Sequence, residues 1–413
     1  MQSLEAKDIE AIRKQFPIFQ GKEDFIYLDT AATAHKPKCV MEACEKCYAQ
    51  QYATVHRSVY GLAMEATSTY ERVRQRVCAF LHASSPEEIV FTKSTTEAIN
   101  LVARSLGSTV LTPGSEVLIS LTEHHSNIVP WQWICKERGA ELKVIPITST
   151  GELDREALEE LLTERTKIVS IAHIANTTGT VHPIEYIAKA AHKKGAVVLV
   201  DGAQSASHMP VDVQKMGCDF FTFSGHKAYG PTGIGVLFGR LPLLKAMPPY
   251  QGGGDMIEEV TFEQSTFQPP PLRFEAGTPP ISQVFGLNAA IEFIESVGRE
   301  RIAAWENRLL QYAMQKLMKI PGLRIVGTSA HKGAIISFTV EEAHPLDLAT
   351  LLDAKGVALR SGHMCAQPTL QHFGLSSLLR VSFGIYNTLP EIDRFVFLLE
   401  QAINVLKSGL IRV

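Results

Sequence analysis

A single lysine follows an apolar run in the middle of the chain. Residues 219–223 (Asp-Phe-Phe-Thr-Phe) are typical of a buried strand, and Ser224-Gly225-His226-Lys227 comes directly after them. A lysine is costly to hold at the end of a buried strand unless its amine is paired or takes part in chemistry. The chemistry that fits this setting is a Schiff base between the amine and an aldehyde. A surface lysine that happens to follow a strand is the alternative, and the tetrapeptide alone does not decide between them.

An acidic residue ends another apolar run upstream. Residues 197–200 (Val-Val-Leu-Val) predict a buried parallel strand that brings Asp201 to its carboxyl end, where open α/β sheets place their ligands. The interval to Lys227 is 227 − 201 = 26 residues, which is enough for one crossover and the next strand. A carboxylate that keeps a pyridine nitrogen protonated turns the ring into an electron sink, so the pair favours pyridoxal phosphate as the aldehyde. Taken alone, Asp201 would more simply be a helix N-cap.

Hydroxyl residues at 94–96 lie between a predicted strand, 89–92, and an amphipathic helical pattern. Hydroxyls and free backbone N–H groups at the start of a helix form an anion site, so we expect the cofactor phosphate here. A helix cap made by Ser94 and Glu97 explains the same residues, and both interpretations can hold at once. The expected phosphate donors are Thr95, Thr96, Ser224 and His226.

A histidine pair, His124 and His125, follows the predicted strand 117–120. A histidine at this position could stack on a flat ring and transfer protons. Capping of the next helix is the alternative. We expect no metal site, because no acid or cysteine lies at ligand spacing.

One of the seven cysteines, Cys365, lies in a short loop, 360–368, that also holds glycine, histidine and proline. An exposed thiol near cationic groups is the kind that is populated as thiolate at neutral pH. The other six are typical of core or surface cysteines, and the spacing of Cys44 and Cys47 has no second pair beside it. An odd number of cysteines indicates a reducing compartment rather than a disulfide framework.

These motifs, in this order, resemble those of the cysteine desulfurases, which are fold-type I pyridoxal phosphate enzymes of the class-V aminotransferase family. Within them the chain resembles the group II branch, which includes the SufS type and selenocysteine lyases. The resemblance covers essentially the whole chain and rests on residues 27–33, 55–57, 95–97, 123–125, 176, 201–204, 224–227, 252–254, 275–279, 360–368 and 380. Three positions depart from the family: Ser94 replaces a common glycine, Pro280 an asparagine and Met364 a second histidine, which leaves fewer groups to activate Cys365.

The resemblance implies a reaction. Lys227 would carry pyridoxal phosphate and remove the Cα proton of L-cysteine, and His124 would stack on the ring. Cys365 would take the substrate sulfur as a persulfide, leave L-alanine and pass the sulfur on for iron–sulfur cluster assembly. The other implied site residues are Asp201 at the ring nitrogen, Gln204 at the ring oxygen, Asn176, His56, Arg360 and Arg380 around the substrate or cofactor, and Thr278, which in the family reaches the cofactor phosphate of the other subunit.

The resemblance also implies partners: a second copy of the chain in a homodimer, and a small sulfur-acceptor protein of the SufE or SufU type. His344 is a candidate acceptor contact, although an ordinary loop histidine explains it as well. Another fold-type I lyase or transaminase would keep Lys227 and Asp201 but would have no use for Cys365.

The composition fits a cytoplasmic enzyme. The 413 residues are 45% hydrophobic, and 40 basic against 43 acidic residues give a net charge of −3, so neither nucleic acid nor a membrane surface is expected as a partner. The chain has no apolar run long enough for a membrane span, and its charged amphipathic N-terminus does not resemble a signal peptide.

Strands alternating with helices predict an α/β fold with a mostly parallel sheet between helices, which the resemblance makes seven-stranded. We expect residues 20–290 to form this large domain, and 1–19 with 291–413 to form a smaller α+β domain. Residues 252–271 are expected as a long loop, explained either by a subunit interface or by a mobile surface.

Overall fold

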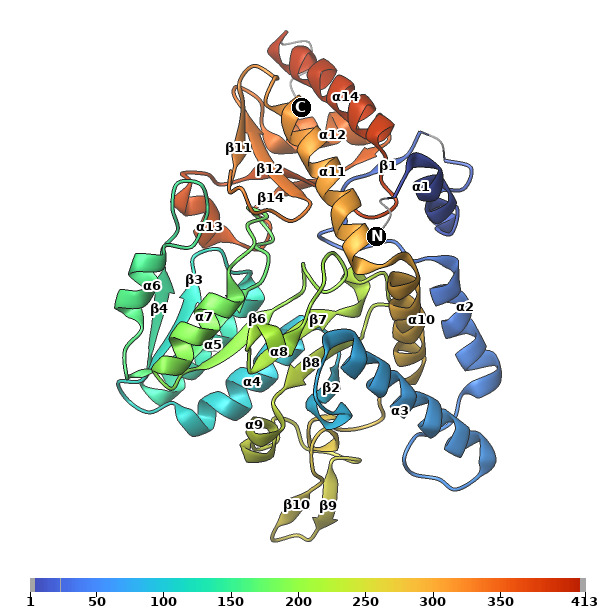
Figure 1. Ribbon diagram of the computed structural model, residues 1–413, viewed down its shortest axis with the longest axis vertical. Coiled ribbons are helices and arrows are strands. Elements are labelled where there is room, and N and C mark those ends of the chain that lie inside the picture. The colour runs from blue at the N-terminus through green and yellow to red at the C-terminus, as the bar shows by residue number, and fades with distance from the viewer. Residues whose placement is uncertain (1–3, 23, 409–413) are drawn as a thin grey trace.

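The computed structural model describes residues 4–22 and 24–408 of the chain. A seven-stranded sheet with its helices forms the larger part, and a four-stranded sheet with long helices forms a smaller part near the C-terminus (Figure 1). The division into two domains stays a prediction, and residues 1–3 and 409–413 of the expected small domain lie outside the described residues.

The large sheet has the strand order β2-β8-β7-β6-β5-β3-β4. Only β8 runs against the others, because it pairs antiparallel with both β2 and β7 while the remaining pairs are parallel. The mostly parallel sheet expected from the sequence is therefore confirmed. Its strands are β2 (Ile89–Thr92), β3 (Glu116–Ser120), β4 (Glu141–Ile145), β5 (Thr166–Ala172), β6 (Val197–Asp201), β7 (Phe220–Ser224) and β8 (Gly235–Gly239).

Helices link these strands and cover the sheet (Figure 1). Strands such as β7 are buried at every position, as expected for a sheet covered on both faces. The helices of this part are α2 (Lys38–Lys46), α3 (Gly61–Leu81), α4 (Thr95–Val110), α5 (Val129–Arg138), α6 (Arg155–Leu161), α7 (Ile184–Lys193), α8 (Val213–Met216), α9 (Leu241–Ala246) and α10 (Ile281–Val297).

The smaller part is built on an antiparallel sheet of order β11-β12-β15-β14. Its strands are β11 (Leu323–Val326), β12 (Ile335–Val340), β14 (Arg360–Gly362) and β15 (Leu378–Ser382), and its helices are α11 (Arg299–Leu317), α12 (Pro345–Asp353), α13 (Gln367–His372) and α14 (Leu389–Lys407).

The N-terminal segment packs on this smaller part. Helix α1 (Ala6–Arg13) ends at Arg13, which pairs with Glu391 of α14 at 2.8 Å. Strand β1 (Ile26–Tyr27) then pairs with β13 (Val357–Ala358). The segment before the large sheet thus lies against C-terminal strands.

The expectation of a long loop at 252–271 is wrong. The segment contains a hairpin, β9 (Ile257–Val260) with β10 (Ser265–Phe267), which projects from the body of the molecule (Figure 1). Glycines and prolines at both ends of the segment obscured two short strands between them.

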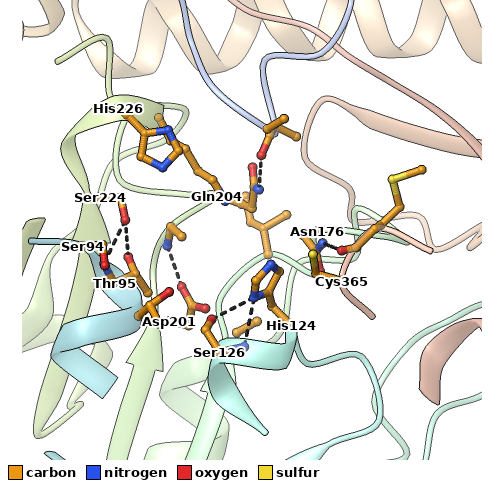
Figure 2. A pocket seen from close by; sticks show the side chains of 18 of the residues that line it. Ser94, Thr95, His124, Ser126, Asn176, Asp201, Gln204, Ser224, His226 and Cys365 are labelled. Carbon is orange, nitrogen blue, oxygen red and sulfur yellow. Dashed lines mark hydrogen bonds between the residues drawn. The ribbon is translucent and has the colours of Figure 1, made fainter. Parts of the chain in front are cut away.

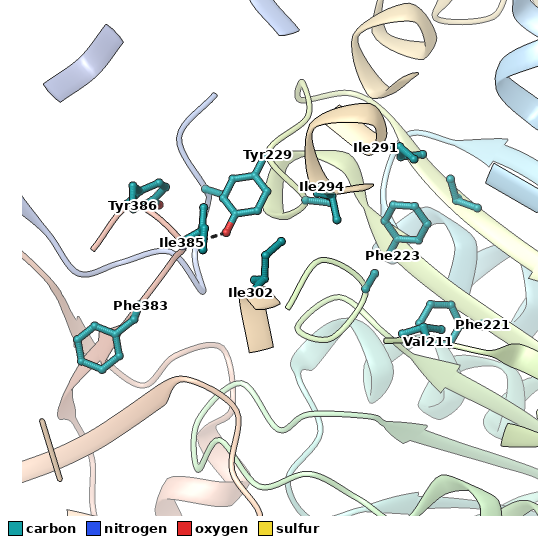
Figure 3. Close-up of a cluster of buried hydrophobic side chains, with 14 of the residues drawn as sticks. Val211, Phe221, Phe223, Tyr229, Ile291, Ile294, Ile302, Phe383, Ile385 and Tyr386 are labelled. Carbon is teal, nitrogen blue, oxygen red and sulfur yellow. Dashed lines mark hydrogen bonds between the residues drawn. The ribbon is translucent and has the colours of Figure 1, made fainter. Parts of the chain in front are cut away.

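A buried cluster joins the two parts beside the lysine loop. Tyr229, two residues after Lys227, is fully buried, and its hydroxyl accepts the N–H of Ile385 at 3.2 Å (Figure 3). Its ring packs edge-on against Phe293 of α10 and Tyr386. This packing fixes the loop that carries Lys227 against the smaller part of the chain.

Candidate active site

One cavity of about 270 Å³ gathers most of the residues expected from the sequence. Figure 2 shows Thr95 and Ser224 at one side, Asn176 and Cys365 at the other, and Asp201 with His124 between them. The predicted residues that line the cavity are Thr95, Thr96, His124, Asn176, Asp201, Gln204, Ser224, His226, Lys227, Arg360, Cys365 and Arg380.

Lys227 ends the short 3-10 turn that follows β7, so the buried strand delivers its amine to the cavity wall. Burial lowers the pKa of Lys227 to about 8, and the carboxylate of Asp201 opposes this shift without cancelling it. An amine with this pKa is partly neutral near neutral pH, which a nucleophile or a base requires.

Asp201 is the last residue of β6 and is only 6% exposed. Its Oδ1 accepts the backbone N–H of Ala203 at 2.9 Å, whereas Oδ2 has no hydrogen-bond partner among the described residues. Burial raises the pKa of this carboxyl, while the bond from Ala203 and the charge of Lys227 act in the opposite direction. One carboxylate oxygen is thus held in place and the other is left for a ligand.

The start of α4 forms a cradle of donors. Ser94 caps the helix by accepting the N–H of Glu97, and Ser224 accepts the N–H of Thr95 at 2.8 Å. The N–H of Thr96 has no partner in the described part of the chain, as is usual in the first turn of a helix, and it can donate to an anion. A side-chain carbon at Gly235 would lie 2.6 Å from the Cα of Ser94, so only glycine lets β8 approach the cradle this closely.

His124 lines the middle of the cavity with its orientation fixed by one neighbour. Its Nδ1 accepts the N–H of Ser126 at 3.1 Å, which places the ring proton of a neutral imidazole on Nε2. Burial, followed by the charge of Lys227, lowers the pKa of His124 to about 3. The ring is therefore a neutral Nε2–H donor throughout the physiological range.

Arg380 and Asn176 form the end of the cavity nearer β15. Arg380 donates from Nη1 to the Asn176 carbonyl and from Nη2 to Asp29 Oδ1, each at 3.1 Å. Asn176 donates from Nδ2 to the carbonyl of Met364 at 2.7 Å (Figure 2). Arg380 Nε and Asn176 Oδ1 are buried without a partner among the described residues, so this end of the site is polar and incompletely satisfied.

Cys365 reaches the cavity from the loop between β14 and α13 and is partly buried. Its N–H donates to His363 Nδ1 at 3.1 Å, and its carbonyl accepts the N–H of His125 at 2.8 Å. The thiol therefore shares one cavity with Lys227, although 138 residues (365 − 227) separate them in the sequence.

Three predicted residues lie elsewhere. His56 pairs with Glu71 of α3 at 2.9 Å and does not line the cavity, and Thr278 is exposed outside it. His344 is exposed at the start of α12, where its Nδ1 accepts the N–H of Leu346. The roles assigned to these residues stay predictions.

The residues of the cavity fit pyridoxal phosphate. The donor cradle of α4 and Ser224 suits a phosphate, the free Oδ2 of Asp201 suits a protonated ring nitrogen, and the amine of Lys227 suits an aldehyde. Gln204 also lines the cavity and donates to the carbonyl of Ala31 at 2.8 Å.

Three contributors to the site were not predicted from the sequence. Ser126 orients His124, Asp29 pairs with Arg380, and the Met364 carbonyl binds Asn176. Ser126 lies two residues after His124, a spacing that could have indicated a local side-chain-to-backbone bond. Asp29 and Met364 carry no comparable local signal.

Comparisons with known proteins agree with this geometry. Residues 26–395 match the aminotransferase class-V family. The chain is 46% identical over 405 residues to a cysteine desulfurase of Synechococcus elongatus, covering 97% of this chain but 64% of that protein's length. It is 46% identical to a cysteine desulfurase of Dickeya dadantii, covering 95% of this chain and 96% of that one.

A solved structure is similar throughout. The apo cysteine desulfurase of Thermococcus onnurineus NA1 superposes with a TM-score of 0.93 at 38% identity, covering 98% of this chain and all (100%) of that one. The lysine, aspartate and cysteine share one cavity, and the family match and the relatives cover nearly the whole chain. The chain therefore belongs to the cysteine desulfurases, a pyridoxal-phosphate-dependent group of the class-V aminotransferase family.

Proposed function

We propose that this chain converts L-cysteine to L-alanine and retains the released sulfur as a persulfide on Cys365. The observation that carries the proposal is the placement of Lys227, Asp201 and Cys365 around a single cavity. The first two residues suit any pyridoxal phosphate enzyme of this fold. The thiol distinguishes sulfur transfer from transamination, because a transaminase does not need a nucleophile facing the substrate side chain.

The bound cofactor would supply an electron sink beside the substrate Cα. Asp201 would hold a proton at the ring nitrogen through its free Oδ2, while the Ala203 N–H keeps the carboxylate in place. Lys227 in its neutral form would take the Cα proton, which its lowered pKa permits.

Arg380 would bind the substrate carboxylate. Its guanidinium is held by Asp29 and by the Asn176 carbonyl, so its position is set before substrate arrives. Arg360 lies on the exposed rim of the same cavity and adds a second positive charge for the incoming anion.

The thiolate of Cys365 would attack the substrate sulfur. An S–S bond forms as the Cβ–S bond breaks, and the electron pair from Cβ–S is taken up by a proton at Cβ, so L-alanine and a persulfide are the balanced products. The Nε2–H of His124 would donate a hydrogen bond to the substrate in the middle of the cavity during this step.

The test is stoichiometric. Cofactor-loaded protein and a small excess of L-cysteine, without added reductant, should give a burst of one L-alanine per subunit and then only slow turnover, because the free L-cysteine thiol is a poor reductant of the persulfide. Addition of dithiothreitol should speed the reaction with release of sulfide. Lys227→Ala should make no alanine. Release of pyruvate or of keto acid in place of alanine would refute the proposal.

We further propose a SufS-type role in which a small protein collects the sulfur for iron–sulfur cluster assembly. Only two residues separate Cys365 from Pro368, where α13 has begun, so the persulfide cannot swing far from the cavity. An acceptor must then bring its own thiol to the rim. His344 is a candidate contact, because it is exposed and only its Nδ1 is used within the described residues, by the N–H of Leu346.

Alanine formation at a fixed reductant concentration should rise when a SufE-type or a SufU-type acceptor is added. His344→Ala should reduce that rise without changing the rate in reductant alone. Absence of acceleration by either acceptor would contradict this role.

A homodimer is proposed from the surface. Exposed apolar side chains recur along one stretch of the chain, from the π-turn 47–51 to the first turn of α3: Tyr48, Tyr52, Val59, Tyr60, Leu62 and Met64. Such a cluster is typical of an interface. Thr278 is also exposed outside its own cavity, which suits a residue that serves the partner's phosphate.

Subunit mixing tests the dimer. If Thr278 acts across the interface, a mixed dimer of one Thr278→Ala subunit and one Lys227→Ala subunit carries both changes at the same site, so its other site should be intact and active. A mixture with no more activity than its components, at a measured dimeric mass, would contradict the proposed role of Thr278.

The proposed compartment is the cytoplasm. The seven cysteines are free, and the chemistry needs a reduced thiol at Cys365. None of the helices in the described ranges is long and apolar enough to cross a membrane.

Selenocysteine is proposed as a second substrate, because selenium leaves more readily than sulfur.

A further inference from the structure

The Cys365 loop has an unusual backbone. Met364 and Cys365 are adjacent, neither is glycine, and both have positive φ angles, 56° and 53°. The left-handed region is unfavourable for residues with a Cβ, and two such residues in sequence persist only where the surroundings hold them. The contacts around the loop should therefore include the groups that keep the thiol in place.

Three hydrogen bonds reach the loop from other segments. Asn176 donates to the Met364 carbonyl at 2.7 Å, and the N–H of His125 donates to the Cys365 carbonyl at 2.8 Å. The third bond involves the same histidine as acceptor: the N–H of Gln367, the first residue of α13, donates to His125 Nε2 at 3.2 Å. His125 thus makes two hydrogen bonds to the loop: its backbone N–H donates to the carbonyl of Cys365, and its ring accepts the N–H of Gln367.

The position of His125 in the chain connects these two hydrogen bonds with the reaction. It follows His124 directly, within the turn that Ser126 stabilises, and the ring of His125 lies 5.6 Å from that of His363, which in turn accepts the Cys365 N–H. A single short segment therefore presents the imidazole of His124 to the cavity and fixes the loop of the nucleophile.

We propose that His125 is a positioning residue, whose ring nitrogen Nε2 holds the strained Cys365 loop at the distance from His124 and Lys227 that sulfur transfer needs. The inference rests on the proposed role of Cys365 as sulfur carrier. His125 touches neither cofactor nor substrate in this role, since it does not line the cavity and acts through the Gln367 N–H.

The test compares two amides at one position. The oxygen of glutamine in His125→Gln can reach the place of Nε2 and accept the Gln367 N–H, whereas the shorter asparagine in His125→Asn cannot. Both variants are polar and keep the backbone bond to Cys365. His331→Asn and His331→Gln form the matched control pair, because His331 is exposed and its side chain has no hydrogen bond among the described residues.

The first readout is alkylation of Cys365 by iodoacetamide in the cofactor-loaded protein without substrate, followed by peptide mass mapping. We expect His125→Asn to react about fivefold faster than wild type, the factor for loss of one neutral hydrogen bond, and His125→Gln to stay within about twofold. The second readout is steady-state alanine formation, in which His125→Asn should lower kcat and leave KM for L-cysteine unchanged.

The alkylation rates of the two amide variants decide whether the ring of His125 holds the loop. Wild-type alkylation in His125→Asn overturns the proposal, and equally fast alkylation in both amide variants assigns the ring to packing, which also overturns it. If wild type makes no alanine, the proposed function fails while the alkylation contrast still decides the role of His125. Should His125→Asn not fold, hydrogen exchange of the Gln367 amide in wild type decides: protection supports the bond, and free exchange refutes it.

Discussion

The amine of Lys227 should titrate near pH 8 in cofactor-free protein rather than near its usual 10.5. Burial disfavours the charged ammonium and lowers the pKa, while Asp201 favours it and acts in the opposite direction. Since a lowered pKa means that the folded protein releases this proton more easily, the neutral amine should grow in as the pH rises from 7 to 9.

The size of the effect follows from these values. At pH 7 a lysine with a pKa of about 8 is neutral in roughly one molecule in ten, which is on the order of 300 times the neutral fraction of a lysine at 10.5. Asp201→Asn removes the carboxylate that holds the pKa up, so the midpoint of Lys227 should move below 8 in that variant. Glu164→Gln, which changes a surface carboxylate paired with Lys194, should leave it in place.

Competitive acetylation measures this directly. Trace acetic anhydride is added at a series of pH values with an acetyl-lysine peptide as standard, and the Lys227 peptide is quantified by mass spectrometry. A midpoint near 10 in wild type would refute the argument from burial. An upward shift in Asp201→Asn would refute the assigned direction of the Asp201 charge.

Three further variants test separate parts of the account. Cys365→Ala should abolish alanine release from L-cysteine yet keep much of any selenocysteine turnover, measured side by side; equal loss on both would contradict the nucleophile's role. Arg380→Lys should raise KM for L-cysteine by about tenfold or more, because one ammonium cannot bond Asp29 and Asn176 and still present a fork to the carboxylate; an unchanged KM would exclude Arg380 from substrate binding. Tyr229→Phe should lower the free energy of unfolding in urea by ~1–3 kcal/mol, because the buried N–H of Ile385 loses its acceptor; full stability would show that this N–H finds another partner.

The residues that local sequence could predict are those at the ends of buried strands. Asp201 and Lys227 each follow a run of apolar residues, and the crossover rule for parallel strands brings both runs to one edge of the sheet. Ser94 and Thr95 are similarly visible, because a strand, a hydroxyl cluster and a helical period succeed one another.

Long-range partners could not be predicted in this way. Asp29 and Arg380 are 351 residues apart, and their pairing depends on how the N-terminal segment lies along β15. The bond from Asn176 to a backbone carbonyl leaves no mark in the sequence, because any residue at 364 would offer the same oxygen. The β9–β10 hairpin is hard to predict for two reasons: its strands are short and exposed, so they lack the apolar periodicity of a core strand, and glycines and prolines flank them.

The proposed role of Cys365 is to receive the sulfur of L-cysteine. The most direct measurement is mass mapping of the cofactor-loaded protein after brief exposure to L-cysteine and trapping with iodoacetamide. We expect one extra sulfur atom on the Cys365 peptide in amounts that match the alanine formed, and none in Lys227→Ala. Alanine formed in full while the extra sulfur is absent from Cys365, or lies on another cysteine, would contradict it.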